Sequence, residues 1–195
     1  ALLRRLPADK IAYGGIPVDT SSLQSVEIPE NPSPVRLFLG RHRHRMEEKG
    51  TDLFETAIRR AIERNPGKGE LVIVENRPYE EYLSLMRSAH VIIDQAYSYT
   101  PATNALLSMA YGIPTVSGGE PEYYDFIGEP DTPLRRPIIN SPVTLDEMTA
   151  MFDNILNHPE RLRDLGKASR EFVLRNNDCD IVARRFLTFW QARLG

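Results

Sequence analysis

Residues 35–40 read VRLFLG, a short apolar run that a glycine ends. Similar runs rich in valine and isoleucine recur at 71–74, 91–93 and 113–116, with a weaker one at 138–139. None of them alternates polar and apolar residues, as a strand with one solvent-facing side would. Uninterrupted apolar strands are typical of a sheet that is covered on both faces. The pattern therefore predicts a buried parallel sheet.

Helical segments lie between these runs. Residues 51–64 carry apolar side chains at helical spacing on one face and charged side chains off it. Segments 78–89 and 101–112 each open with a proline, which suits the first turn of a helix, and the second closes with a glycine. From about residue 144 onward the chain is helical throughout. This alternation predicts an α/β fold: a doubly wound, Rossmann-like parallel sheet with extra C-terminal helices.

The composition is that of an ordinary globular protein. The 195 residues are 41% hydrophobic and 26% charged, with a formal net charge of −3, which does not suit a protein that coats nucleic acid. The single cysteine, Cys179, cannot form an internal disulfide, and no apolar run approaches the roughly 18 residues that span a bilayer. We expect a cytoplasmic location, with peripheral attachment to the inner membrane as the alternative for a full-length protein.

The first 34 residues differ from the rest. Residues 15–34 are crowded with proline, serine and glycine and show no sustained period. We interpret residues 1–34 as a lead-in or interdomain linker and residues 35–195 as the folded domain.

Ligands of such sheets bind beyond the carboxyl ends of the strands, so the loops that follow the apolar runs are the places to look. The first loop carries Arg41 and, at a helix entry, Lys49. Cations and free amides at a helix start favour a phosphate. The alternative is a solvated loop whose arginines pair with Glu47 and Glu48. His42 and His44 lack a third ligand nearby, and we predict no metal site.

The loop after residues 91–93 supplies a second phosphate-binding element. Thr100 is predicted to cap the following helix, which would direct the amides of Ala102, Thr103 and Asn104 toward the side where Arg41 lies. A nucleoside and sugar would then lie against neighbouring loops. The candidates for that part of the site are Arg77, Pro78, Tyr99, Gly119, Glu120 and Glu122.

The order of these loops resembles a known family. Gly40-Arg41, Lys49-Gly50, the SMAYGIP segment at 108–114 and the GGEPE segment at 118–122 follow one another as in the nucleotide-sugar half of the GT-B glycosyltransferases, specifically glycosyltransferase family 4. The NHPERLRDLGK segment at 157–167 and the IAYGGIPVD segment at 11–19 are similar to that family as well.

The resemblance implies the donor-binding domain of a two-lobed enzyme of polysaccharide or cell-envelope glycan synthesis. The donor would be a UDP- or GDP-sugar, transferred with retention of configuration to a glycan or lipid-linked glycan held by an N-terminal lobe that is absent from this chain. The isolated domain would then be inactive. Arg41 and Lys49 match the family's cationic pair on the donor pyrophosphate. No cofactor and no metal are implied.

The sequence departs from the family at two positions. Family members carry two glutamates eight residues apart, where this chain has Tyr99 and Leu107. Asp94 or Glu120 could substitute in space, and the catalytic residues stay unassigned. Two alternatives remain open: a non-catalytic module that binds a nucleotide, a sugar or a partner protein, and a nucleotide-sugar epimerase. Residues 178–180 read DCD, which mimics a metal motif, but their position between two late helices favours a helix cap.

Overall fold

A single five-stranded parallel sheet forms the centre of the molecule. The computed structural model describes residues 7, 10–41 and 46–194. Its strands are ordered β2-β1-β3-β4-β5 and all neighbours are parallel, which confirms the predicted fold class. The strands are β1 (Val35–Gly40), β2 (Gly69–Val74), β3 (Val91–Ile93), β4 (Thr115–Ser117) and β5 (Ile139–Asn140).

The strand order creates a switch point between β1 and β3. The chain runs from β1 outward to β2 and then returns past β1 to β3, from which it continues in the opposite direction. Leu39 pairs with Ile93 across this point, so the two strands end side by side. Loops diverge at such a point and leave a crevice at the carboxyl edge of the sheet.

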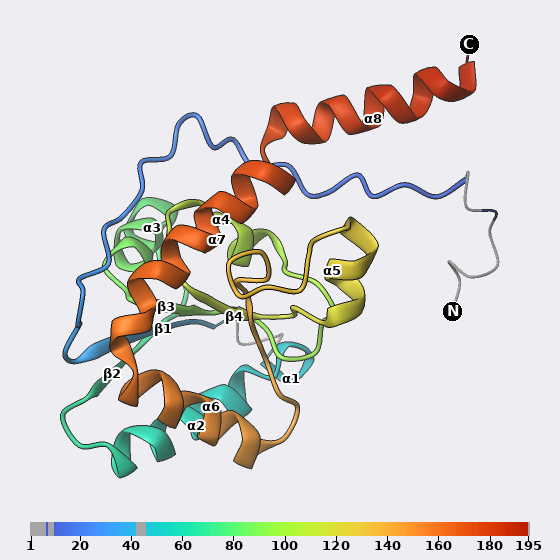
Figure 1. The fold of residues 1–195 in the computed structure, drawn as a ribbon. Coiled ribbons are helices and arrows are strands. Elements are labelled where there is room, and N and C mark those ends of the chain that lie inside the picture. The colour runs from blue at the N-terminus through green and yellow to red at the C-terminus, as the bar shows by residue number, and fades with distance from the viewer. Residues whose placement is uncertain (1–6, 8–9, 42–45, 195) are drawn as a thin grey trace.

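Helices cover both faces of the sheet (Figure 1). Helices α2 and α6 pack together on one face, and α3, α4 and α7 lie over the other. The helices are α1 (Met46–Lys49), α2 (Thr51–Arg64), α3 (Tyr79–Arg87), α4 (Thr103–Ala110), α5 (Pro121–Ile127), α6 (Leu145–Asn157), α7 (Leu162–Asn176) and α8 (Cys179–Leu194), and a 3₁₀ turn at Pro159–Arg161 precedes α7.

Aromatic side chains fill both interfaces. Phe54 of α2 and Phe152 of α6 meet edge to face at 6.1 Å between ring centroids, and both are fully buried. Tyr124 and Phe172 do the same at 5.9 Å on the other side. The strand residues between these layers, such as Phe38, are inaccessible to solvent. Burial on both faces explains why the strand sequences contain no polar alternation.

The start of α4 differs from the prediction. Thr100 is not the N-cap: the helix begins at Thr103, and Ala102 occupies the N-cap position without a side-chain bond. The hydroxyl of Ser98 donates to the Thr100 carbonyl at 2.8 Å and accepts from the Thr100 amide at 3.3 Å. These bonds hold residues 98–100 in a turn of their own, which delays the helix by two residues.

The fifth strand also begins one residue later than predicted. The Ile138 amide donates to the Tyr124 hydroxyl at 3.1 Å, so it is not available to a neighbouring strand. The ladder with β4 therefore pairs Val116 with Ile139 and Ser117 with Asn140.

From its N-terminal end, the described part of the lead-in segment runs beside α8, then passes α7 and enters β1 (Figure 1). Val18 bridges to residue Asp178, with its amide 2.7 Å from the Asn177 carbonyl. Asp178 caps α8, as predicted, by accepting from the Asp180 amide at 3.0 Å. A hydrogen bond donated by the Thr20 hydroxyl is the main cause that lowers the pKa of the Asp178 carboxyl.

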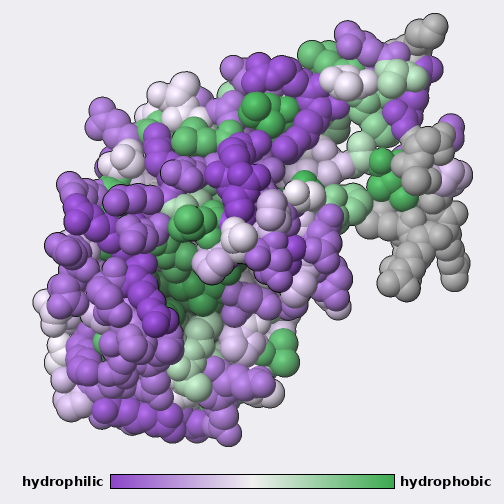
Figure 2. Space-filling view, viewed as in Figure 1, coloured by the Kyte–Doolittle hydropathy of each residue, from purple (hydrophilic) through white to green (hydrophobic). Residues whose placement is uncertain are grey.

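Helix α8 extends away from the body of the molecule beside the lead-in segment (Figure 1). Three of its large apolar side chains, Phe186, Leu187 and Trp190, are exposed. Figure 2 shows hydrophobic residues along this extension, while the rest of the visible face is mostly hydrophilic around a central hydrophobic hollow. Across the described residues, no helix combines the length and hydropathy needed to cross a bilayer.

Candidate functional site

Arg41 lies directly after β1 at the carboxyl edge of the sheet. Its amide bonds the Val74 carbonyl at 2.9 Å, which aligns it with the end of β2. Its guanidinium is held by two carboxylates: Nε donates to Glu75, and Nη1 donates to Glu55 of α2 at 2.5 Å. The alternative pairing of the loop arginines with Glu47 and Glu48 falls partly outside the described residues, since the other loop arginines and the Glu47 side chain are not among them. Two charge-assisted bonds fix the plane of this half-buried guanidinium.

Lys49 ends α1 and faces the end of β3. Its Nζ lies 3.4 Å from Oδ1 of Asp94, whose side chain is only 1% exposed. The other carboxylate oxygen of Asp94 accepts from the Ser117 hydroxyl at 3.2 Å. A buried carboxylate needs such partners, because an unpaired charge in the interior is costly. Asp94 thus anchors Lys49 at the switch point, and it is not free to replace the missing glutamates.

Two glycines bring the loops of this edge together. Gly50 adopts a left-handed conformation (φ 67°), and a Cβ there would lie 2.9 Å from Ala96 Cβ. The Ala96 amide also donates to the Lys49 carbonyl at 2.9 Å. A Cβ on Gly118 would lie 2.1 Å from the Ser98 carbonyl oxygen. The loops after β1, β3 and β4 therefore touch, and Arg41, Lys49 and the turn at Thr100 share one edge.

The N-terminus of α4 opens onto the same edge. Among the described residues, no group accepts from the backbone amides of Thr103 and Asn104. The Asn104 side chain accepts a 2.8 Å hydrogen bond from the Tyr82 hydroxyl of α3. That hydroxyl also lies against β1, because a Cβ on Gly40 would approach it to 2.6 Å. The first turn of α4 is thereby tied to the end of the central strand.

A surface pocket of about 460 Å³ adjoins these loops. Tyr97, Tyr99, Glu120 and Glu122 line it together with smaller residues. The two tyrosines are 51% and 71% exposed, so their rings are open to stacking rather than packed at the base of the loop. The pocket offers aromatic faces and carboxylate oxygens within one hollow, a combination that suits a base or a sugar.

The structure places the residues predicted to bind the nucleoside and sugar in two separate locations. Tyr99, Glu120 and Glu122 line this pocket, and Gly119 lies beside it with its amide bonded to Asn140 at 2.9 Å. Arg77 and Pro78 instead follow β2, on the far side of Arg41. Arg77 is exposed and pairs with Glu81 at 3.3 Å.

Sequence reasoning missed Glu55 and Tyr82 at this edge, and it did not identify Glu75 as a partner of Arg41. The two glutamates lie on a helix and a loop whose approach to Arg41 depends on the β1–β2 pairing. Tyr82 and Met86 are four residues apart in α3, and that spacing could have marked Tyr82 as an inward-facing residue. Burial of its ring raises the pKa of Tyr82 to about 12.

Neither position of the missing glutamates supplies an acid. Tyr99 is largely exposed, and Leu107 packs against the core. His42 and His44 lie outside the described residues. Within the part of the chain that the structure describes, no three histidine, cysteine or acidic side chains gather as metal ligands.

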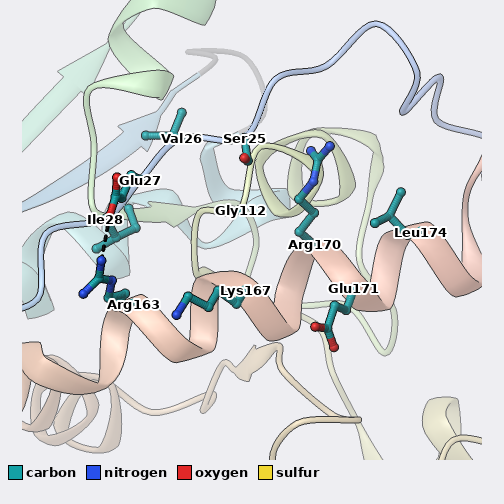
Figure 3. Close-up of a pocket in the computed structure, with 10 residues that line it drawn as sticks. All are labelled: Ser25, Val26, Glu27, Ile28, Gly112, Arg163, Lys167, Arg170, Glu171 and Leu174. Atoms are coloured by element: carbon teal, nitrogen blue, oxygen red, sulfur yellow. Dashed lines mark hydrogen bonds and ion pairs between the residues drawn. The ribbon is translucent and has the colours of Figure 1, made fainter.

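A second pocket, of about 380 Å³, lies at the opposite edge beside Gly112, which precedes β4. Figure 3 shows it between the lead-in segment and α7. Its arginines are used to hold the lead-in: Arg163 pairs with Glu27 at 2.6 Å, and Arg170 donates to the carbonyls of Ala110 and Leu23. Its described lining includes none of the residues at the switch point.

The fold is that of the C-terminal domain of GT-B glycosyltransferases. The C-terminal domain of a group 1 family glycosyl transferase, LpcC from Francisella tularensis, superposes with a TM-score of 0.57 at 15% identity, over 80% of this chain and 96% of that one. The lipopolysaccharide outer core galactosyltransferase WaaB gives 0.59 at 16% identity, over 99% of this chain and 58% of that one.

A third similar structure carries a ligand. The pneumococcal O-GlcNAc transferase GtfA, in complex with UDP and GlcNAc, gives a TM-score of 0.57 at 14% identity, over 89% of this chain and 39% of that one. No protein-family model and no curated protein matches the sequence. At these identities the likeness concerns the fold, which confirms the GT-B resemblance at that level; membership of family 4 is not confirmed.

Proposed function

We propose that this chain is the donor-binding domain of a glycosyltransferase that uses a UDP- or GDP-sugar. One observation carries the proposal: two cations, each anchored by carboxylates, share the switch-point edge of the sheet with the free amides of a helix start. Cations and helix amides that meet at such a crevice bind phosphate groups.

The carboxylates around Arg41 position its guanidinium and leave some of its N–H donors available. A guanidinium has five N–H donors, and the bonds to Glu55 and Glu75 use two of them, which leaves three. Lys49 has three donors and spends one on Asp94, which leaves two. Both side chains can thus bind a diphosphate while their ion pairs stay formed.

The same arrangement suits catalysis of sugar transfer. Negative charge grows on the nucleotide diphosphate as the bond to the sugar breaks. Positive groups that are already fixed in place stabilise this charge without having to reorganise. In this proposal Arg41 and Lys49 supply the positive charge, and the amides of Ala102, Thr103 and Asn104, with the turn at Thr100, bind the phosphate oxygens. No catalytic acid or base is assigned.

The nucleoside and sugar occupy the neighbouring loops in this proposal. Tyr99 offers a ring to the base or sugar, while Glu120 and Glu122 accept hydrogen bonds from hydroxyls in the pocket. Gly119 allows the ligand close to the backbone. Arg77 and Pro78, beyond Arg41, line the far end of the edge.

The similar structures support the donor class and the setting. GtfA binds UDP, and WaaB acts on lipopolysaccharide, so we place the chain in the synthesis of a polysaccharide or cell-envelope glycan. The chain spans 58% and 39% of the lengths of these two proteins. We therefore propose a separate acceptor-binding lobe. The family resemblance adds to this proposal transfer with retention, and work in the cytoplasm or at the inner membrane surface.

The test is nucleotide binding by this domain. UDP or GDP should raise its melting temperature, and calorimetry should give a dissociation constant. Arg41→Ala and Lys49→Ala should each weaken binding about tenfold or more, because each removes a charge-assisted hydrogen bond worth about 1.5–3 kcal/mol.

Arg36→Ala is the matched control. Arg36 belongs to the same strand as the Arg41 loop and also pairs with a glutamate, Glu70, at 3.1 Å. It lies at the amino end of β1, so its removal should leave nucleotide affinity unchanged. The proposal is wrong if no nucleotide binds, or if Arg36→Ala weakens binding as much as Arg41→Ala does.

A non-catalytic nucleotide-binding module is the second candidate. It is favoured by the absence of an acid at Tyr99 and Leu107, the first of which is exposed and the second packed into the core. The parent protein distinguishes the two: an enzyme releases UDP or GDP from its sugar donor when acceptor is present, whereas a module binds the nucleotide and releases none.

A further inference from the structure

The Tyr82 hydroxyl joins three elements beneath the proposed diphosphate site. It donates to Oδ1 of Asn104 in the first turn of α4 at 2.8 Å. It lies where a Cβ on Gly40 would be 2.6 Å away, at the end of β1. Its own ring packs edge to face on Phe38 at 5.2 Å between centroids. The ring is therefore fixed by the core, and the hydroxyl is fixed by the ring.

The direction of this hydrogen bond determines what Asn104 presents. Since Oδ1 accepts the hydrogen bond from the Tyr82 hydroxyl, the carboxamide turns its N–H₂ group away from α3. Among the described residues, no group accepts from that N–H₂. Two side-chain donors thus remain beside the free backbone amides of the same helical turn.

The hydroxyl keeps its donor role at physiological pH. Burial is the main cause that raises the pKa of Tyr82 to about 12, and the Asp94 carboxylate contributes a smaller part of that rise. The hydroxyl lies at the end of β1, beside Gly40, and Lys49 pairs with Asp94 just after β3. Because β1 and β3 are neighbours in the sheet, the tyrosine, the asparagine and the lysine belong to one edge.

We propose that Tyr82 is a positioning residue for donor binding: its hydroxyl orients the Asn104 carboxamide so that the N–H₂ group donates to the donor diphosphate. The inference rests on the proposed function and extends it to a neutral donor beside the two cations. Gly40 contributes to the same arrangement, because any side chain at that position would displace the Tyr82 hydroxyl. Tyr82 acts through Asn104 and does not touch the ligand.

The first experiment measures UDP affinity by calorimetry for Tyr82→Phe, which keeps the ring and removes only the hydroxyl. We expect about five- to tenfold weaker binding, because the carboxamide is then free to rotate. Asn104→Ala should weaken binding about tenfold, equivalent to about 1.4 kcal/mol. In the Asn104→Ala background, Tyr82→Phe should have no further effect on affinity.

Gly40→Ala provides an independent approach to the same hydroxyl. It should weaken UDP binding in the presence of Tyr82, but cause little further loss in the Tyr82→Phe background, where the atom it strikes is gone. Tyr111→Phe is the matched control. Tyr111 is a buried tyrosine at the other end of α4, so removal of its hydroxyl should leave UDP affinity unchanged.

The outcomes separate the two proposals. If the unaltered domain binds neither UDP nor GDP, the proposed function fails and this inference fails with it. If it binds UDP and Tyr82→Phe binds equally well, the inference alone is overturned. Additive losses from Tyr82→Phe and Asn104→Ala overturn it as well, since they would mean that the hydroxyl affects binding without the carboxamide.

Discussion

The ion pair between Lys49 and Asp94 makes a sharp prediction about stability. Lys49→Met keeps the apolar stem of the side chain and removes the ammonium group. Among the described residues, this leaves the Asp94 carboxylate, buried at 1% exposure, with the Ser117 hydroxyl as its one side-chain donor. Asp94→Asn leaves the lysine instead, and that side chain still reaches water at 23% exposure. The two changes break the same ion pair, but Lys49→Met leaves a carboxylate unpaired and Asp94→Asn leaves an ammonium group unpaired.

The structure sets the size of the effect. At 3.4 Å and an effective dielectric constant of about 20, the pair attracts with about 5 kcal/mol before desolvation is counted. Loss of one partner from a buried pair costs about 3–5 kcal/mol. Because the Lys49 end is partly exposed, we expect Lys49→Met to lower the free energy of unfolding by about 2–3 kcal/mol. Asp94→Asn should cost about 1 kcal/mol.

The assay is urea unfolding followed by circular dichroism at neutral pH, for both single variants and the double variant. At this chain length, the loss from Lys49→Met corresponds to a melting temperature about 4–12 °C lower. The double variant should be more stable than Lys49→Met alone, because the stranded carboxylate is gone. A double variant less stable than either single one would refute the reasoning, since the cost would then come from packing and not from an unpaired charge.

Three further predictions follow from the structure. Burial, with Arg36 nearby, lowers the pKa of His90 below 6.5, and its Nδ1 accepts from the Arg36 amide at 3.0 Å, so the unfolded chain binds the proton more readily. The free energy of unfolding should therefore fall as the pH drops below about 6.5. In the same pH series, the His90→Asn variant should show a smaller fall in unfolding free energy below about pH 6.5. An unchanged slope would mean that His90 does not cause the fall. Gly118→Ala should cost about 2–3 kcal/mol in urea unfolding, because the new methyl would meet the Ser98 carbonyl at 2.1 Å. Gly69→Ala would meet only side-chain atoms, of Leu156 at 2.8 Å and of Ile62 at 3.0 Å, and should cost less; equal costs would refute the backbone clash. UDP affinity, measured by calorimetry from 50 to 500 mM salt, should fall as salt rises, since partly exposed cations bind the ligand; an affinity independent of salt would mean that the pocket recognises an uncharged group.

Local pattern was sufficient for the elements and for the edge of the candidate site. The apolar runs at 35–39 and 91–93 lie buried on both faces, and their largely apolar composition predicted that burial. Parallel strands separated by helices all end at one edge, so the loop positions of Arg41 and Lys49 followed from the alternation alone. Boundaries were less secure, as the Ser98 turn before α4 shows, because side-chain bonds within a loop compete with helix caps.

The order of the strands and the partners of the site residues came from the tertiary structure. No local sequence pattern predicts that the chain returns past β1 to form β3, and this return creates the switch point. Lys49 and Asp94 are 45 residues apart, and Tyr82 and Asn104 are 22 apart, so each pair meets only when the helices pack on the sheet. Sequence periodicity records which face of an element is buried, whereas a contact between two side chains depends on where both elements lie. The chain alone therefore showed that cations stand at a sheet edge, and the folded molecule decided which carboxylates hold them and which donors stay free.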